Sequence, residues 1–198
     1  GGGMDKLTYE VAVADIEFGD RHRKNLGDLE TLAASIQEQG LLQPVGITES
    51  NELVFGERRL RACRDILGWQ AIPARVVHVT SIVEGEYHEN EIRLAFTPEE
   101  RVHIGRAVET EASKRHGGDR RSDDFQERKN SPLKGKSSEI AAQRAGFGND
   151  RTYRQAKEIV EAAEAEPERF QGVLDQMNRT GKVGGAHPPP PEVQQSSL

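Results

Sequence analysis

The hydrophobic pattern of this chain changes once, near residue 97, and this change constrains the fold more than any other feature. Before it, short β-branched runs alternate with helical repeats; after it, helical spacing alone recurs. Strands are expected at about 7–13, 44–48, 53–55 and 72–79, and helices at about 29–40 and 57–67. We therefore predict an α+β domain over residues 7–96, followed by an all-α domain over residues 97–180.

Local signals place the ends of the helices. Asp28 is suited to cap the first helix, and Gly40 to end it. The run Thr97-Pro98-Glu99-Glu100 combines a cap, a proline at the first helical position and a glutamate three residues after the cap. The helix that it starts is expected to reach about Arg115, and further helices are expected at 138–145, 150–166 and from Pro167 onward.

Composition limits how much of the chain can be packed. Charged side chains make up 30% of the 198 residues and apolar ones 34%, against roughly 45–50% apolar, with Gly counted, in an ordinary domain. We therefore expect three unpacked stretches: a tag and disordered start at residues 1–6, a mobile basic loop at residues 116–136 and a Pro-rich tail at residues 181–198.

The same composition excludes several classes of protein. No apolar run reaches the roughly 20 residues that span a membrane, and the start has no signal-peptide core. The single cysteine, Cys63, cannot form an internal disulfide or a CxxC zinc site. We expect a soluble cytoplasmic protein without a membrane partner, whose net charge of −6 argues mildly against nonspecific binding of nucleic acid.

An arginine-rich run lies where a strand is expected to end and a helix to begin. It reads Gly56-Glu57-Arg58-Arg59-Leu60-Arg61-Ala62. A glycine there lets an anion approach the backbone, and the arginines add fixed positive charge, so the run is suited to hold a polyphosphate. Taken alone, the same residues also describe an ordinary amphipathic helix with arginines on its solvated face.

Residues 139–147 have the spacing of a helix-turn-helix. Ala142 permits close crossing of two helices, Gly146 makes the turn, and Phe147 fills the space between them. The polar start of the next helix is suited to base edges and phosphates in a major groove. The candidate DNA contacts are Asn149, Arg151, Thr152, Arg154, Gln155 and Lys157. The alternative is a helical hairpin that serves only for packing.

The charge around this motif supports DNA binding. Residues 114–136 hold eight basic and four acidic side chains. A mobile, net-positive loop directly before the motif is suited to contact phosphates.

Three boxes in this order resemble the N-terminal domain of the ParB partition proteins, which share a fold with sulfiredoxin. The first runs from Leu32 through Gly40 to Val45, the second is the run at residues 56–62, and the third is Glu89-Asn90-Glu91-Ile92-Arg93. The resemblance covers about residues 11–165. It implies an α+β nucleotide-binding domain, then a helical DNA-binding domain.

The resemblance also implies a CTP switch that uses Mg²⁺. The residues implied for nucleotide binding are Gln43, Gly56, Glu57, Arg58, Arg59 and Arg23. Glu89 and Asn90 are implied as Mg²⁺ ligands, and their oxygen atoms are donors that this ion prefers. A solvated helix face is the alternative for these two residues.

Two departures from the family pattern leave the choice of nucleotide open. The family's Gln-Pro-Arg-Lys segment is replaced by Arg21-His22-Arg23-Lys24, and Ile92 replaces a glutamine. CTP, ATP and GTP therefore all stay possible. Arg58 stands where sulfiredoxin has its catalytic cysteine, so Cys63 is expected to be a small buried residue.

The implied partners are double-stranded DNA and a second copy of the chain through the N-terminal domain (a dimer), whereas a ParA-type ATPase is left open as a partner. The implied role is DNA partition or regulation of a plasmid or mobile element, with any hydrolysis a slow CTPase activity.

Two other functions stay open. One is an enzyme of the same fold, an ATP-dependent small-molecule kinase or a nuclease, with Asp20 or Asp28 near Arg23 as its base. The other is a plain repressor with an unused nucleotide pocket.

Overall fold

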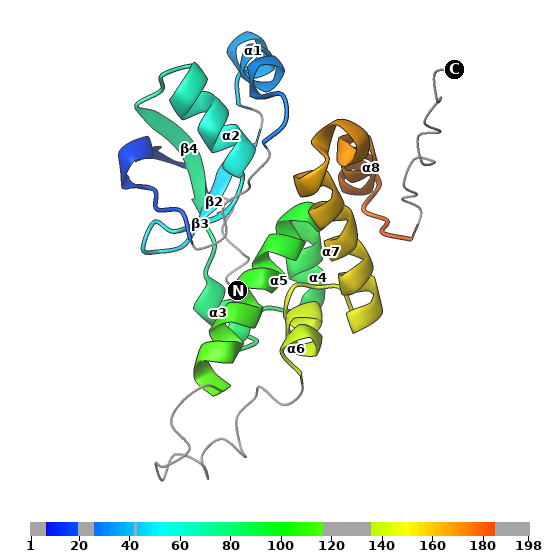
Figure 1. Cartoon of the computed structure of the whole chain (residues 1–198). Coiled ribbons are helices and arrows are strands. Elements are labelled where there is room, and N and C mark those ends of the chain that lie inside the picture. The colour runs from blue at the N-terminus through cyan, green and yellow to red at the C-terminus, as the bar shows by residue number, and fades with distance from the viewer. Residues whose placement is uncertain (1–6, 20–25, 42, 117–135, 185–198) are drawn as a thin grey trace, which may run out of the picture.

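A four-stranded mixed sheet organises the first half of the chain (Figure 1). The computed structural model describes residues 7–19, 26–41, 43–116 and 136–184. The strands are β1 (Tyr9–Ala12), β2 (Val45–Ile47), β3 (Leu53–Phe55) and β4 (Ala71–Val76). Their order is β1-β4-β2-β3, with β2 parallel to β4 and the two outer pairs antiparallel.

Two helical segments form a core with this sheet. They are α1 (Leu29–Gln39) and α2 (Glu57–Arg61), which continues as a π-helical turn over Ala62–Ile66. Ile36, Leu60 and Ile72 are among the buried side chains of this core. Asp28 caps α1 as expected, because its carboxylate accepts a hydrogen bond from the Thr31 amide at 3.0 Å. Cys63 is also buried, and burial raises the pKa of its thiol to about 11, so thiol chemistry is disfavoured.

The rest of the described chain is helical. The helices are α3 (Val79–Val83), α4 (Glu89–Ala95), α5 (Pro98–His116), α6 (Ser137–Arg144), α7 (Asp150–Ala165) and α8 (Pro167–Thr180). Among the described residues, no helix combines the length and the apolar character needed to cross a membrane. The predicted fold class, α+β followed by all-α, is confirmed.

The expected helix start at residue 97 is also confirmed. The Thr97 amide donates to the Glu100 carboxylate at 2.9 Å, and the Glu100 amide donates to the Thr97 hydroxyl at 3.3 Å. This reciprocal pair satisfies two amides that the first helical turn leaves open.

The segment that follows β4 differs from the expectation. The sequence predicts a strand that continues to Val79, but β4 ends at Val76 and Val79 begins α3. The β-branched residues favour a strand locally, whereas the helix buries Ile82 and Val83 in the helical cluster.

The hydrophobic clusters do not divide at residue 97. Phe55 of β3, Val77 and the buried residues of α3 and α4 pack with α5 to α8 rather than with the sheet core. The predicted domain limits stay a prediction. Of the stretches expected to be unpacked, residues 1–6, 117–135 and 185–198 lie outside the described residues.

Candidate nucleotide cleft and helix-turn-helix

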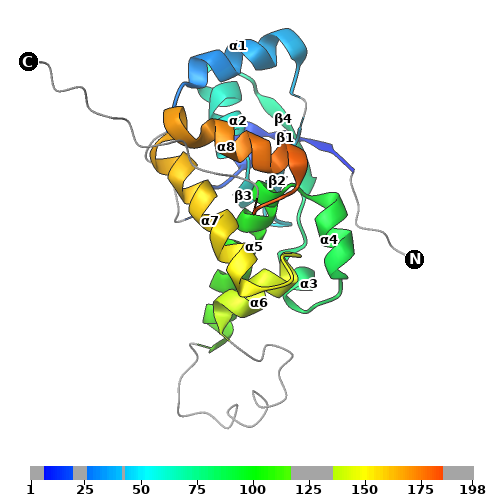
Figure 2. The same cartoon turned by 90° about the vertical axis from the view of Figure 1, so that its right-hand side faces the viewer.

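A cleft of about 1410 Å³ separates the sheet and α2 from helices α5, α7 and α8. Figure 2 shows α8 passing between α2 on one side and α7 on the other. Five of the six residues expected to bind nucleotide line this cleft: Gln43, Gly56, Glu57, Arg58 and Arg59. The sixth, Arg23, lies outside the described residues.

Gly56 forms the junction between β3 and α2. Its φ of 96° lies in the left-handed region, where a residue with a Cβ atom would be strained. A Cβ atom at this position would lie 2.8 Å from Val45 Cγ1. The expected reason for the glycine was the approach of an anion, but the structure shows that the backbone angle and the close packing of β2 already require it.

The guanidinium groups of Arg58 and Arg59 donate hydrogen bonds to neutral acceptors. Arg58 donates to the Leu26 carbonyl at 2.8 Å and to the Gln171 side-chain oxygen at 3.2 Å. Arg59 donates to the carbonyls of Gln43 and Pro44, at 2.9 and 3.0 Å. Among the described residues, neither arginine forms an ion pair with a carboxylate.

The neighbouring arginines of the same helical segment are different. Arg61 pairs with Glu57 at 3.1 Å, and Arg64 pairs with Asp65 at 2.8 Å. Both also lie over the Phe18 ring, at 4.7 and 5.1 Å. The uncompensated positive charge of this segment is therefore concentrated at Arg58 and Arg59, which face the cleft.

Across the cleft, the lining residues of α5, α7 and α8 carry more acidic than basic side chains. Arg106 of α5 donates to the Glu164 carboxylate of α7 at 2.7 Å and lies 3.6 Å from that of Glu161. An anion in the cleft would meet attractive charge on the α2 side rather than on this wall.

Glu89 and Asn90 do not line this cleft in the described structure. They begin α4, where Glu89 pairs with Arg93 and Asn90 is exposed. The Glu89 carboxylate would lie 3.2 Å from a Cβ atom built on Gly148, so it lies beside the helix-turn-helix turn. The described residues contain no cluster of three or more His, Cys, Asp or Glu side chains that could hold a metal ion. The role of Glu89 and Asn90 as Mg²⁺ ligands stays a prediction.

The turn between α6 and α7 is tightly packed. Phe147 is 6% exposed, and its ring lies 5.4 Å from that of the fully buried Tyr153. The Arg101 guanidinium of α5 lies over the Phe147 ring, 4.3 Å from its centroid, and donates to the Gly146 carbonyl at 2.9 Å. Tyr153 in turn donates to the Glu109 carboxylate at 2.9 Å. α5 therefore holds the turn and α7 in a fixed relation.

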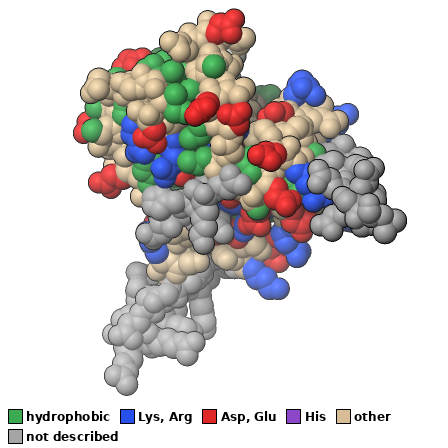
Figure 3. All heavy atoms as spheres, turned by 45° about the horizontal axis from the view of Figure 1, so that its top comes forward, with side chains coloured by type: hydrophobic (Ala, Val, Ile, Leu, Met, Phe, Trp, Pro, Cys, Tyr) green, Lys and Arg blue, Asp and Glu red, His purple; other side chains and the backbone are tan. Residues whose placement is uncertain are grey.

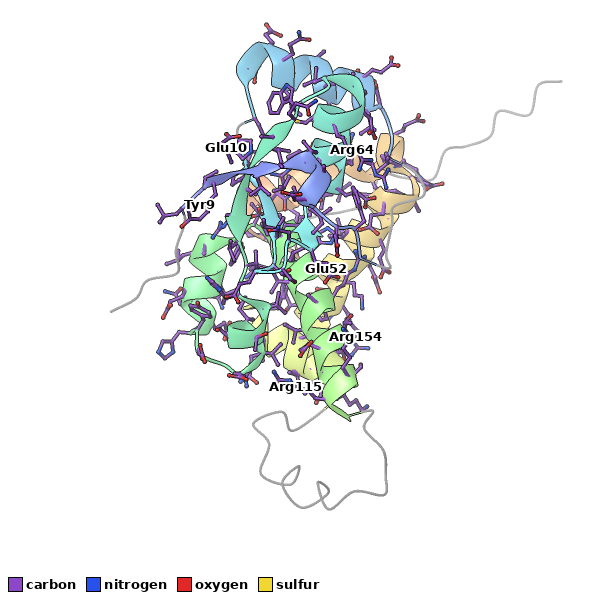
Figure 4. The ribbon with its side chains drawn as sticks, turned by 90° about the vertical axis from the view of Figure 1, so that its left-hand side faces the viewer. Tyr9, Glu10, Glu52, Arg64, Arg115 and Arg154 are labelled. Carbon is purple, nitrogen blue, oxygen red and sulfur yellow. The ribbon has the colours of Figure 1, made fainter. Side chains whose placement is uncertain are left out.

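Three of the candidate DNA contacts share the exposed face of α7. They are Arg151, Arg154 and Gln155. Arg154 has a 67% exposed side chain and pairs with Asp150 at 2.6 Å, one turn earlier. Figure 4 labels Arg154 near the lower end of the molecule, far from Tyr9 and Glu10 on the edge strand β1.

Of the other three candidates, the Asn149 and Lys157 side chains have intramolecular partners, and Thr152 contributes its backbone amide. Asn149 caps α7 by accepting a hydrogen bond from the Thr152 amide at 2.8 Å. Lys157 faces α5, where it pairs with Glu109 at 3.1 Å. Sequence reasoning missed Asp150, Arg101 and Glu109, which position the candidate contacts or the turn. The order Asn-Asp-Arg-Thr at residues 149–152 is itself a recognisable cap signal, but the long-range partners have no local signature.

Asp28, a candidate base of the alternative enzyme, caps α1 with its carboxylate. Its pKa is lowered, first by the side-chain hydrogen bond from Thr31 and to a smaller degree by the positive charge of Arg58. A lowered pKa makes a carboxylate a weaker base. Asp20, the other candidate, lies outside the described residues.

Comparison with known sequences identifies the first half of the chain. The family model of the ParB N-terminal domain matches residues 4–87. A probable plasmid-partitioning protein ParB from Thermus thermophilus is 44% identical over 61 residues, which are 29% of this chain and 20% of the relative. The chain thus matches about a fifth of the length of that curated relative.

Solved structures with related names align over most of the chain at low similarity. A C2221 crystal form of a pNOB8-like ParB N-domain aligns with a TM-score of 0.39 and 13% identity, over 91% of this chain and 77% of the other. A C-terminally truncated chromosome-partitioning protein ParB from Caulobacter crescentus, complexed with CTPγS, aligns with a TM-score of 0.31 and 16% identity, over 89% of this chain and 97% of the other.

The first two boxes, at residues 32–45 and 56–62, lie within the residues that the family model matches, and the third, at residues 89–93, follows directly after them. Residues 4–87 of this chain belong to the family of ParB N-terminal domains.

Proposed function

We propose that this protein binds double-stranded DNA through α6 and α7 and a nucleoside triphosphate through the Gly56–Arg59 segment, with the nucleotide acting as a switch. CTP is the foremost candidate, and Glu89 and Asn90 are the proposed donors to Mg²⁺. The proposed role is DNA partition or the regulation of a plasmid or mobile element, with self-association through the N-terminal domain. The name of the curated relative supports partition, although the match covers only part of that protein.

One observation carries the nucleotide half of the proposal. Arg58 and Arg59 face the cleft with their charges on neutral acceptors, whereas Arg61 and Arg64 are paired with carboxylates. Phosphate oxygens are charged acceptors and bind guanidinium groups more strongly than carbonyl oxygens do. A triphosphate is therefore able to displace the present partners of both arginines.

The partner of Arg58 gives the switch a physical basis. Gln171 belongs to α8, 113 residues further along the chain, so this hydrogen bond joins the sheet half to the helical half. A Cβ atom on Gly27 would lie 2.9 Å from Pro167, which shows that the same two parts are also in close contact nearby. A phosphate that draws Arg58 away from Gln171 would change how α8 rests on α2.

The charge distribution is compatible with binding of DNA by one part of an acidic protein. Figure 3 shows acidic and basic side chains interspersed over the face it presents, rather than gathered by sign. On α7, Arg151 and Arg154 are exposed at the start of the helix, while Glu158 and Glu161 follow toward its end. The start of α7 is therefore the part suited to approach a phosphate backbone.

The nucleotide half is tested by isothermal titration of the intact chain with CTP, ATP and GTP in Mg²⁺. The proposal predicts that one nucleotide, CTP foremost, binds more tightly than millimolar. Weaker binding of all three would contradict it. If the protein were instead a plain repressor with an unused nucleotide pocket, none of the three nucleotides would bind, but DNA binding would be retained.

The DNA half is tested by sequencing the DNA recovered with the protein and then measuring affinity for the enriched site. The Arg151→Ala, Arg154→Ala double variant should lose about a hundredfold in affinity at low salt, because two phosphate or base contacts are removed. Arg169→Ala on the neighbouring helix α8 is the control, since Arg169 is not a candidate contact and pairs with Glu166. Equal losses in both variants would argue against the proposed face of α7.

A further inference from the structure

A side chain of the helical half already occupies Arg58, one of the two arginines of the proposed nucleotide site. The Arg58 Nη1 atom donates to the side-chain oxygen of Gln171, on α8, at 3.2 Å. Both residues line the cleft, so this hydrogen bond lies along the wall where a phosphate group would bind. A phosphate oxygen that approached the Nη1 atom would have to replace the Gln171 oxygen.

Asp175 orients the amide of Gln171. The Gln171 Nε2 atom donates to the Asp175 carboxylate, one helical turn later, at 2.9 Å. Because its nitrogen is held in this way, the amide presents its oxygen to Arg58. The three side chains form a continuous chain of hydrogen bonds, in which the negative charge of Asp175 polarises the amide and strengthens its oxygen as an acceptor.

The other hydrogen bonds of the two cleft arginines stay within the sheet half. The second acceptor of Arg58 is the Leu26 carbonyl, just before α1. Arg59 donates to the carbonyls of Gln43 and Pro44, just before β2. Among the described residues, α8 therefore reaches this pair of arginines at Arg58, and the position of α8 determines whether Arg58 has its partner.

The charge of α8 also disfavours an anion beside Arg58. Asp175 is exposed and lines the cleft, and its carboxylate is linked to Arg58 through the Gln171 amide alone. A phosphate group at Arg58 would therefore lie near a like charge, which raises its free energy. A phosphate oxygen is still a stronger acceptor for a guanidinium group than an amide oxygen is, so the contact lowers phosphate affinity without abolishing it.

We propose that Gln171, oriented by Asp175, competes with the phosphates of the nucleotide for Arg58. The arrangement of α8 against α2 is then a low-affinity state of the cleft, and Gln171 sets the affinity without binding the nucleotide itself. This inference rests on the proposed nucleotide function. Coupling of this kind is reciprocal, so any event that moves α8 away from α2 should raise nucleotide affinity by the factor by which the nucleotide favours that movement.

The test is isothermal titration of CTP in Mg²⁺ into the intact chain and into two variants of one residue. Gln171→Ala removes the competing oxygen and should tighten CTP binding at least about threefold. Gln171→Glu should weaken it at least about threefold, because a carboxylate holds Arg58 by a charge-assisted hydrogen bond. A merely structural role of Gln171 would not move the two affinities in opposite directions.

Gln176→Ala is the matched control. Gln176 is exposed on the same helix and does not line the cleft, so its loss should leave CTP affinity unchanged. Thermal unfolding of all three variants checks that each keeps its fold.

The outcomes separate this inference from the proposed function. If the wild type binds CTP and Gln171→Ala binds it equally or more weakly, the competition is overturned while the nucleotide site stands. A gain in Gln171→Ala that Gln176→Ala matches would overturn the competition as well. Absence of CTP binding in the wild type and in Gln171→Ala would contradict the proposed nucleotide function itself, and the inference with it.

Discussion

Phe147→Ala should be the substitution that most directly shows how the helix-turn-helix is held. Phe147 is 6% exposed and contacts both the Tyr153 ring and the Arg101 guanidinium. Truncating a buried phenylalanine costs about 3–5 kcal/mol, and losing the cation–π contact adds about 1 kcal/mol. The expected loss of about 4–6 kcal/mol is a large part of the 5–15 kcal/mol that keeps a protein folded.

The assay is thermal unfolding followed by circular dichroism. At roughly 2–4 °C per kcal/mol for a chain of this size, the midpoint should fall by roughly 8–24 °C. Leu94→Ala is the reference, because Leu94 is 73% exposed and its truncation should cost less than about 0.5 kcal/mol. If the two variants unfolded at the same temperature, Phe147 would not fill the space between α5, α6 and α7, and the packing argument would be refuted.

Two other predictions concern the backbone and a buried charge. Gly56→Ala should lower the free energy of unfolding in urea by about 2–5 kcal/mol, because the new Cβ atom would sit at a positive φ and 2.8 Å from Val45. Gly68→Ala is the control: its φ is 66°, but a Cβ atom there meets no other atom within 4 Å, so it should cost only about 1–2 kcal/mol. Equal costs would show that the contact with Val45 is relieved easily. Burial lowers the pKa of Arg101 to about 10, well below its usual range, so above about pH 10 the unfolded chain binds more protons than the folded one. The free energy of unfolding measured in urea should therefore rise with pH above about 10 in the wild type, by at most about 1.4 kcal/mol per pH unit more than in Arg101→Met, and parallel pH profiles would contradict this.

The parts of the fold that the sequence predicts are those with local signals. The capping pair of Thr97 and Glu100, the Asp28 cap and the glycine at residue 56 each act within a few residues or at one backbone angle. α3 was misread because Val77 and Val79 favour a strand locally, while the burial of Ile82 and Val83 depends on contacts with distant helices.

The same limit applies to the candidate sites. The arginine box and the turn residues are contiguous in the sequence, so their motifs could be found. The role of Lys157 could not, because its partner Glu109 lies 48 residues earlier. The hydrogen bond between Arg58 and Gln171 is likewise formed by segments that only the folded chain brings together.

The central claim is that the segment at residues 56–59 binds a nucleoside triphosphate, and calorimetric titration of CTP into Arg58→Ala and Arg64→Ala tests it most directly. Both substitutions remove an arginine from the same helical segment, but Arg58 faces the cleft and Arg64 is paired with Asp65 outside it. We predict that CTP affinity falls at least about tenfold in Arg58→Ala and stays at the wild-type value in Arg64→Ala. Equal affinity of the two variants for CTP would contradict the assignment of this segment as the nucleotide site.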